Sequence, residues 1–106
     1  MIIPKKIKVG ALMYEVFFSE DVTNESDAYG STHNSKEKIF ISPKYSKQRQ
    51  EVTFLHELMH ACFEMSGLNN RFENKKIEEI PTAEDVVREV SILLYQVIKD
   101  NPKLFI

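Results

Sequence analysis

The fold is decided by the stretch Thr53-Phe54-Leu55-His56-Glu57-Leu58-Met59-His60-Ala61. At roughly 100° per residue, an α-helix places His56 and His60 on one face, one turn apart. The opposite face of that helix is apolar and consists of Phe54, Leu58, Ala61, Cys62 and Met65. We therefore predict a long helix whose inner face anchors the core and whose outer face presents two imidazoles.

Signals for both ends of this helix flank the motif. Ser46 is predicted to be the N-cap, because its side-chain oxygen can accept a hydrogen bond from a backbone N–H of the first turn. Gly67 is predicted to end the helix after Ser66, because glycine adopts the left-handed conformation that closes a helix. Pro43 ends any preceding strand, since proline has no N–H to donate to a sheet.

The spacing His56-Glu57-x-x-His60 is typical of a hydrolytic zinc site. Two imidazoles one turn apart can bind one small ion, and Glu57 can reach a water on that ion without binding the metal. The alternative is a pair of ordinary surface histidines beside a solvated carboxylate, since so short a motif recurs by chance. We favour the metal site because the motif lies in the middle of a long helix with an apolar opposite face.

The N-terminal part of the chain has the pattern of β-strands. Residues 2–9 contain β-branched side chains and end at Gly10-Ala11, the predicted turn of a hairpin with Leu12–Phe18. Residues 29–33 and Lys38–Ile41 predict further strands around a turn near residues 34–36. The better core face of the second strand consists of Leu12, Tyr14, Val16 and Phe18. We predict an α+β fold: a small antiparallel sheet of three to four strands packed on the motif helix and on a C-terminal helix.

That C-terminal helix is predicted to begin at Thr82. Asp85, three residues on, gives the pattern of a capping box, and apolar residues recur at helical spacing to about Lys99. Asn101-Pro102 ends the helix. The chain of 106 residues has no internal repeat or linker, so we predict a single domain spanning residues 1–106.

A catalytic zinc ion needs three protein ligands and an open position, so a third ligand is expected outside the motif helix. Glu84 lies at the border of the predicted packed face of the C-terminal helix, whereas Glu89 is predicted to lie on its solvent side. We predict Glu84 as the third ligand, with Glu78 and Glu79 as alternatives. The competing interpretation of Glu84 is an acid favoured by the positive end of the helix dipole.

Composition narrows the class of protein. The hydrophobic content of 42% and charged content of 28% are ordinary for a globular domain, and the net charge of -2 argues against a nucleic-acid partner. The single cysteine, Cys62, cannot form an internal disulfide. The N-terminus lacks the pattern of a secretory signal, and no apolar run approaches the roughly 18 residues that would span a bilayer. We therefore expect a soluble cytoplasmic protein without a membrane partner.

Tyr29-Gly30, Lys38-Ile39-Phe40-Ile41 and the motif helix together resemble the ImmA/IrrE-like zinc metallopeptidases. This gluzincin-type group includes many small phage and mobile-element proteins, and its domain is zincin-like. In that family a later helix begins Glu-x-x-Ala-x-x-Phe-Ala, and its glutamate completes the metal site. Here those four places are occupied by Glu84, Val87, Val90 and Ser91.

The resemblance implies that His56, His60 and Glu84 bind Zn²⁺ and that Glu57 is the catalytic base. Metzincins fit less well, because their third histidine would fall at Ser66. The implied activity is a zinc-dependent endopeptidase acting on a protein or peptide substrate, which the family suggests could be a repressor. Glu57 would take a proton as water attacks the peptide carbonyl and pass it to the leaving amine.

Some features of the reaction stay open. Candidates for an additional oxyanion donor are Tyr29, His33 and Tyr95, although each also suits a structural role, and His33 is expected in an exposed loop. We expect the substrate to lie extended along an exposed sheet edge, such as Lys38–Ile41. Neither the cleavage site nor the oligomeric state follows from the sequence, and the ligand set suits several metals.

Two other functions compete with the peptidase. One is a catalytically inactive zincin-fold binding or regulatory module of phage or mobile-element origin. The other is a metal-free structural protein of the same origin. Glu57 favours the peptidase, because binding of a metal by the two histidines does not require it.

Overall fold

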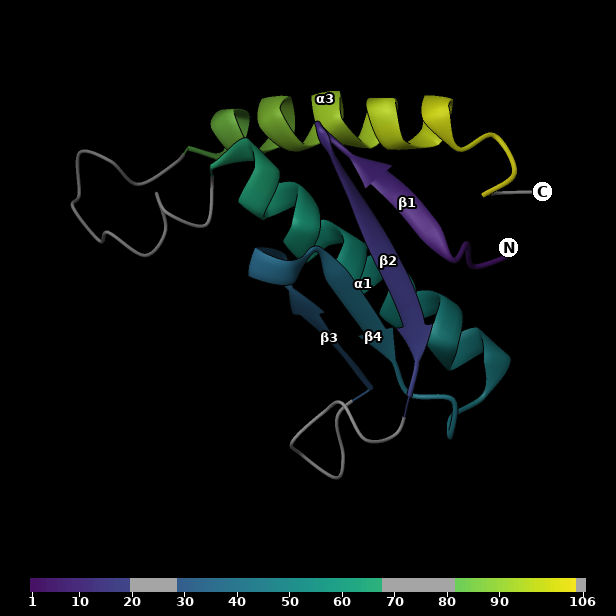
Figure 1. The fold of residues 1–106 in the computed structure, drawn as a ribbon. Coiled ribbons are helices and arrows are strands. Elements are labelled where there is room, and N and C mark those ends of the chain that lie inside the picture. Colours follow the sequence, from purple (N-terminus) through teal and green to yellow (C-terminus); the bar gives the residue numbers. More distant parts are fainter. Residues whose placement is uncertain (20–28, 68–81, 105–106) are drawn as a thin grey trace.

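The computed structural model describes residues 1–19, 29–67 and 82–104. Their secondary structure comprises four strands, a short 3-10 helix and two long helices. In chain order the elements are β1 (Lys6–Val9), β2 (Leu12–Phe18), β3 (Gly30–His33), η1 (Asn34–Lys36), β4 (Lys38–Ile41), α1 (Lys47–Ser66) and α3 (Ala83–Asp100). In Figure 1, α1 runs across one face of the sheet and α3 lies alongside the β1 end. The predicted α+β fold is confirmed.

The sheet has four strands in the order β1-β2-β4-β3. The predicted hairpin is present: β1 and β2 pair antiparallel, and Val9 faces Leu12 across the turn. Gly10 in that turn has φ +61°, a left-handed conformation that glycine adopts without a steric penalty. β3 and β4 are also antiparallel, but β2 and β4 run parallel. The expectation of a wholly antiparallel sheet is therefore wrong at this central pair.

The position of β4 also corrects the expected substrate edge. Lys38–Ile41 is hydrogen-bonded to β2 on one side and to β3 on the other, so its backbone groups are already paired. β3 is the edge strand on the side of the sheet that packs against α1. Periodicity identifies a strand but does not specify its neighbours, and for this reason the sequence pointed to the wrong edge.

The core lies between the sheet and the inner face of α1. Tyr14 and Val16 point into it as predicted, whereas Leu12 and Phe18, at the ends of β2, are 38% and 47% exposed. Burial is the largest cause that raises the pKa of Tyr14 to about 12, and its hydroxyl donates to Asn34 Oδ1 at 2.8 Å. The buried cluster consists of Ile7, Val9, Tyr14, Val16, Ile39, Ile41, Phe54, Leu58, Ala61, Cys62, Val97 and Leu104.

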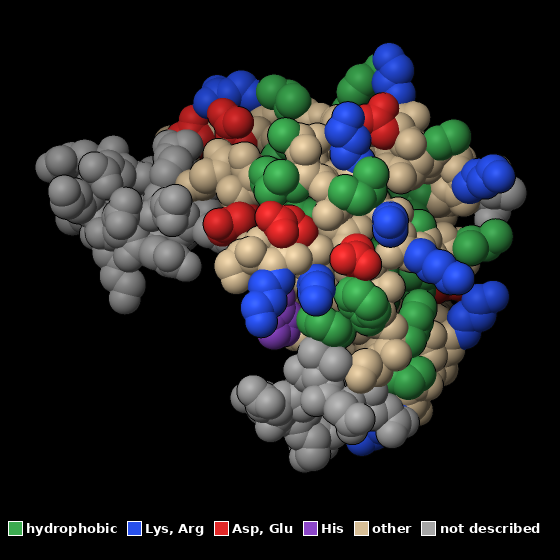
Figure 2. All heavy atoms as spheres, in the orientation of Figure 1, with side chains coloured by type: hydrophobic (Ala, Val, Ile, Leu, Met, Phe, Trp, Pro, Cys, Tyr) green, Lys and Arg blue, Asp and Glu red, His purple; other side chains and the backbone are tan. Residues whose placement is uncertain are grey.

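The other face of the sheet is open and mixes apolar with charged side chains, as Figure 2 shows. The rings of Phe17 and Phe40 stack there with centroids 5.4 Å apart. The ammonium of Lys38 lies 5.7 Å from the centroid of Phe17. Such a face needs no second layer, because antiparallel-rich sheets commonly bury one side only.

The predicted ends of α1 are confirmed. Ser46 Oγ accepts a hydrogen bond from the backbone N–H of Arg49 at 3.1 Å, and Gly67 closes the helix with φ +80°. The face opposite the histidines is buried, including Phe54, Leu58 and Cys62. Burial raises the pKa of the Cys62 thiol to about 11, so this cysteine behaves as an apolar core residue.

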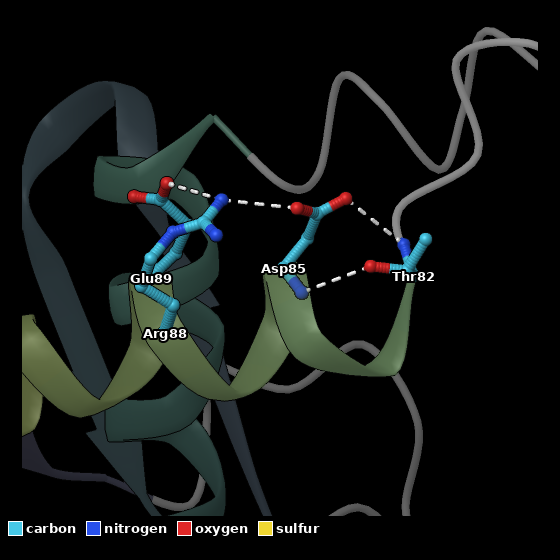
Figure 3. A network of polar contacts seen from close by, with 4 residues as sticks. All are labelled: Thr82, Asp85, Arg88 and Glu89. Atoms are coloured by element: carbon cyan, nitrogen blue, oxygen red, sulfur yellow. Dashed lines mark hydrogen bonds and ion pairs between the residues drawn. The ribbon is translucent and has the colours of Figure 1, made fainter.

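α3 begins with the predicted capping box. The Thr82 hydroxyl accepts from the Asp85 N–H, and the Thr82 N–H donates to the Asp85 carboxylate, each at 3.1 Å (Figure 3). Farther along the helix, Gln96 links α3 to the sheet by accepting from the Gly10 N–H at 2.7 Å and donating to the Lys8 carbonyl at 3.1 Å. Among the described helices, none combines the length and hydropathy required to cross a membrane.

Candidate metal centre

His56 and His60 lie one turn apart on the exposed face of α1. Their Nε2 atoms are 3.2 Å apart, and the side chain of His56 is 66% exposed. Two nitrogens that bind one tetrahedral zinc ion at about 2.0–2.1 Å are separated by roughly 3.3 Å. The two imidazoles are therefore spaced as a pair of zinc ligands would be, although the same distance also permits a hydrogen bond between the rings.

Glu57 is turned toward the sheet and is only 6% exposed. Its Oε1 accepts a hydrogen bond from the Thr32 hydroxyl at 2.7 Å, and the same hydroxyl lies 3.1 Å from the Glu57 carbonyl oxygen. Its Oε2 lies 3.9 Å from His56 Nε2. The carboxylate is thus held in one orientation, with one oxygen bonded to Thr32 of β3 and the other facing His56.

Gly30 permits this close approach of β3 to α1. A Cβ atom at this position would lie 2.6 Å from the Phe40 carbonyl oxygen and 2.7 Å from Thr53 Cγ2. Both distances are far below van der Waals contact, so no larger residue fits without movement of the strand or the helix. Without a side chain at residue 30, the strand lies near enough for Thr32 to reach Glu57.

The surface around His56 is hollowed on two sides. A pocket of about 260 Å³ is lined by Tyr29, Gly30, Arg49, Val52, Thr53, His56 and Glu57. A second hollow of about 200 Å³ is lined by His56, Met59, His60 and Phe63. A larger hollow of about 420 Å³ lies near the two chain ends, but its lining contains no histidine and only one carboxylate, that of Asp100. The chemistry therefore favours the two smaller hollows as the site.

Glu84 is exposed in the first turn of α3. Within residues 1–19, 29–67 and 82–104, no three side chains of His, Cys, Asp or Glu lie close enough together to hold a metal ion. The third ligand therefore stays a prediction. The alternatives Glu78 and Glu79 lie outside the described residues.

The predicted solvent position of Glu89 is only partly correct. Its side chain is 37% exposed, and its carboxylate lies 3.8 Å from the Arg88 guanidinium. Arg88 also bonds to Asp85 at 3.0 Å, so the capping box continues into a short charged network along the helix (Figure 3). Glu89 is therefore drawn along the helix surface by its neighbour Arg88, which the assignment of Glu89 to the solvent side did not include.

Of the candidate oxyanion donors, Tyr29 is the one that lines a pocket with His56 and Glu57. Its ring meets Tyr45 edge-on at 4.6 Å, and the Arg49 guanidinium lies 4.6 Å from its centroid. His33 is exposed as expected, but it is the last residue of β3 rather than part of a loop. Tyr95 is 65% exposed on α3 and lies beneath Lys99.

Thr32 and Arg49 were not predicted from the sequence to be parts of the site. The signal for Thr32 was present, because residues 30 and 32 share one face of a strand and both are small enough for a helix to approach. Arg49 is seven positions before His56, which is two helical turns, so the two residues lie on nearly the same side of α1. That relation was available once the helix start at Ser46 was predicted.

Comparison with known protein families relates the chain to a peptidase family. A model of peptidase family M78, described as the IrrE N-terminal-like domain, matches residues 14–86. The matched region covers well over half of the chain and includes His56, Glu57, His60 and Glu84. Comparisons with curated proteins and with solved structures give no match.

Proposed function

Because the chain belongs to peptidase family M78, the IrrE N-terminal-like domains, we propose that it is a zinc-dependent endopeptidase acting on a protein substrate. Membership in this family supports a metallopeptidase-type domain. The main observation in favour of hydrolysis is the geometry of the motif on α1. The Nε2 atoms of His56 and His60 lie 3.2 Å apart, and Thr32 holds the Glu57 carboxylate beside His56.

The metal would be held by His56 and His60, with Glu84 as the proposed third ligand. Imidazole nitrogens and a carboxylate oxygen form a usual donor set for catalytic zinc. Zinc bound there would lower the pKa of a water and polarise the substrate carbonyl. The transfer of the proton and the positioning of the substrate would be carried out by residues of this chain.

Glu57 is proposed as the general base. The Thr32 hydroxyl binds Oε1 at 2.7 Å, and Oε2 faces His56 at 3.9 Å. We assign Oε2 to receive the proton from the attacking water and to deliver it to the leaving amine. The hydrogen bond from Thr32 keeps the carboxylate from rotating away, so its function here is to position the base.

The substrate is proposed to bind as an extended peptide along β3. This strand is the sheet edge next to α1, and addition of a strand to an exposed edge is a common mode of peptide recognition. We further propose that the substrate is a cytoplasmic protein, with a repressor as the class suggested by the resemblance to the ImmA/IrrE-like group. A single cysteine agrees with a reducing compartment.

The test combines metal content with peptide cleavage for wild type and four variants. Wild type and Glu57→Gln are expected to bind one zinc, but only wild type should cleave a pool of randomised decapeptides. His56→Ala and Glu84→Ala are expected to lose zinc and cleavage together. Lys99→Gln, at the far end of α3, is the control and should match wild type. A wild-type protein that stays metal-free in excess zinc would overturn the proposal.

A second function is an inactive binding module that has the fold but does not cleave its partner. The exposed position of Glu84 favours it, since no three-ligand group is assembled among the described residues. The same experiment separates the two functions. A binding module would retain peptides without cleaving them, and Glu57→Gln would then behave as wild type.

A further inference from the structure

We propose that the pocket beside His56 binds a carboxylate of the substrate through Arg49, and that this contact gives the peptidase a preference for acidic sequences. The inference rests on the proposed function, because it names the substrate class of the same site. The pocket measures about 260 Å³, and its lining includes both Arg49 and Glu57. Among the described residues of that lining, Arg49 is the only lysine or arginine, so it supplies a permanent positive charge that can attract an anionic group.

Arg49 is held in place by an aromatic wall. Its guanidinium lies 4.6 Å from the centroid of the Tyr29 ring, within the range of a cation–π contact. Tyr29 is braced by the edge-on ring of Tyr45 at 4.6 Å. The backbone N–H of Arg49 is fixed separately by the Ser46 cap. Both ends of the residue are therefore restrained before any ligand binds, which lowers the entropy cost of binding.

The charge of Arg49 is available to a ligand. In the described parts of the chain, no carboxylate forms an ion pair with its guanidinium, in contrast to Arg88, which pairs with Asp85 at 3.0 Å. The carboxylate of Glu57 shares the pocket but is already bonded to Thr32. A guanidinium presents parallel N–H donors that match the two oxygens of a carboxylate, so this is the ligand that Arg49 suits best.

The position of Arg49 also fixes which part of a peptide it would contact. Residues 30 and 32 of β3 lie against Thr53 and Glu57 respectively, so β3 and α1 run in the same direction. A peptide antiparallel to β3 would therefore have its carboxyl side nearer Arg49. Seven helical residues span about 10 Å. An extended peptide rises roughly 3.3 Å per residue, so the contact falls two or three residues after the scissile bond.

The carboxylate has two possible sources, an Asp or Glu side chain and the free C-terminus of a short peptide. Two decapeptide pools separate them: one acetylated and amidated at its ends, the other with a free C-terminus. Each pool is bound to immobilised Glu57→Gln protein and is separately digested by wild type. Retained peptides and cleavage products are both identified by mass spectrometry, so binding is measured independently of turnover.

The blocked pool is expected to show Asp or Glu enriched at least fivefold two or three positions after the cleavage site, and enriched among retained peptides. Arg49→Gln should abolish both enrichments without changing zinc content, and Arg49→Glu should favour Lys and Arg instead. Lys99→Gln is the matched control, because its cation also lies over a tyrosine ring, that of Tyr95. Enrichment confined to free C-termini would assign the pocket to the terminal carboxylate.

The outcomes keep this inference distinct from the proposed function. Retention of acidic peptides without cleavage would support the Arg49 pocket while the peptidase proposal fails. Cleavage without an acidic preference would leave the peptidase standing and overturn the Arg49 pocket. An acidic preference that survives in Arg49→Gln would likewise overturn the Arg49 pocket. So would a peptide pool in which the Glu57→Gln protein does not retain acidic peptides selectively.

Discussion

Two regions are expected to form the metal site, and they are held by different kinds of interaction. In the β3–α1 seam, formed by Gly30, Thr32, Thr53 and Glu57, the contacts join residues distant in sequence. At the start of α3, the hydrogen bonds of Thr82, Asp85 and Arg88 all lie within two turns of one helix. Tertiary contacts fix one side chain relative to another element, whereas a local cap only fixes where its own helix begins.

The largest effect should come from Gly30→Ala, which breaks the seam directly. The added Cβ would lie 2.6 Å from the Phe40 carbonyl oxygen, so β3 must move away from α1. We expect the free energy of unfolding to fall by about 3 kcal/mol. Gly67→Ala is the control, because its Cβ meets nothing within 4 Å and only the φ of +80° is unfavourable. The free energy of unfolding of both variants is measured by urea denaturation. A smaller loss for Gly30→Ala than for Gly67→Ala would contradict the close packing of β3 on α1.

Thr32→Val tests the polar contact of the seam while nearly conserving side-chain volume. The Glu57 carboxylate would lose the donor at 2.7 Å, so we expect a stability loss of about 2 kcal/mol. Peptide turnover should fall about tenfold, because the Glu57 carboxylate is no longer held in orientation. Zinc content should stay the same, because the metal ligands are unchanged. Thr32→Ser should restore turnover. Equal turnover in Val and Ser variants would show that the hydroxyl does not position Glu57.

Alkaline pH tests the inner face of α1, on which the seam is built. Burial raises the pKa of Cys62 to about 11, above the ordinary value of 9.0. The unfolded chain therefore ionises first, and stability present below pH 9 is lost as the pH rises toward 11. We expect a loss of up to about 3 kcal/mol across that window. Urea midpoints of wild type and Cys62→Ala should converge as pH rises; parallel curves would count against this assignment.

The smallest effect is expected at the start of α3. Thr82→Ala removes the hydroxyl that accepts from the Asp85 N–H, and loss of such a cap costs about 1 kcal/mol. Asp85→Ala should cost a similar amount, and the double variant should be less destabilised than the sum, since both residues form one capping box. The measurement is again urea denaturation. A loss as large as that of Gly30→Ala would remove the contrast between the two regions.

The elements themselves could be predicted from the sequence because their signals are local. Ser46 and Gly67 mark the ends of α1, and the alternation around Gly10 gives the hairpin. The inner face of α1 follows from helical spacing alone, as the burial of Phe54 confirms. Each of these predictions depends on residues within about two turns or one hairpin of each other, where backbone geometry leaves few alternatives.

What the sequence could not predict was the pairing of those elements. The parallel contact of β2 with β4 joins Glu15 to Lys38, and no local pattern specifies it. The same limitation hid Thr32, since its contact with Glu57 exists only after β3 docks on α1. The motif identified His56 and His60 as neighbours because one helix contains both. Glu84 comes from a different helix, and for it the sequence supplied a hypothesis only.

The parallel pairing of β2 with β4 has a consequence for the order in which the chain folds. The β1–β2 hairpin and the β3–β4 hairpin each join strands that are close in sequence, and such hairpins form in about 1–10 µs. Pairing β2 with β4 brings together residues farther apart in sequence, such as Glu15 and Lys38, and costs more entropy, so union of the two hairpins is expected to limit the folding rate. β3, β4 and α1 follow one another along the chain. The geometry around Glu57 is therefore expected to form before the rate-limiting step, in which the N-terminal hairpin docks and completes the core with Ile7, Val9, Tyr14 and Val16.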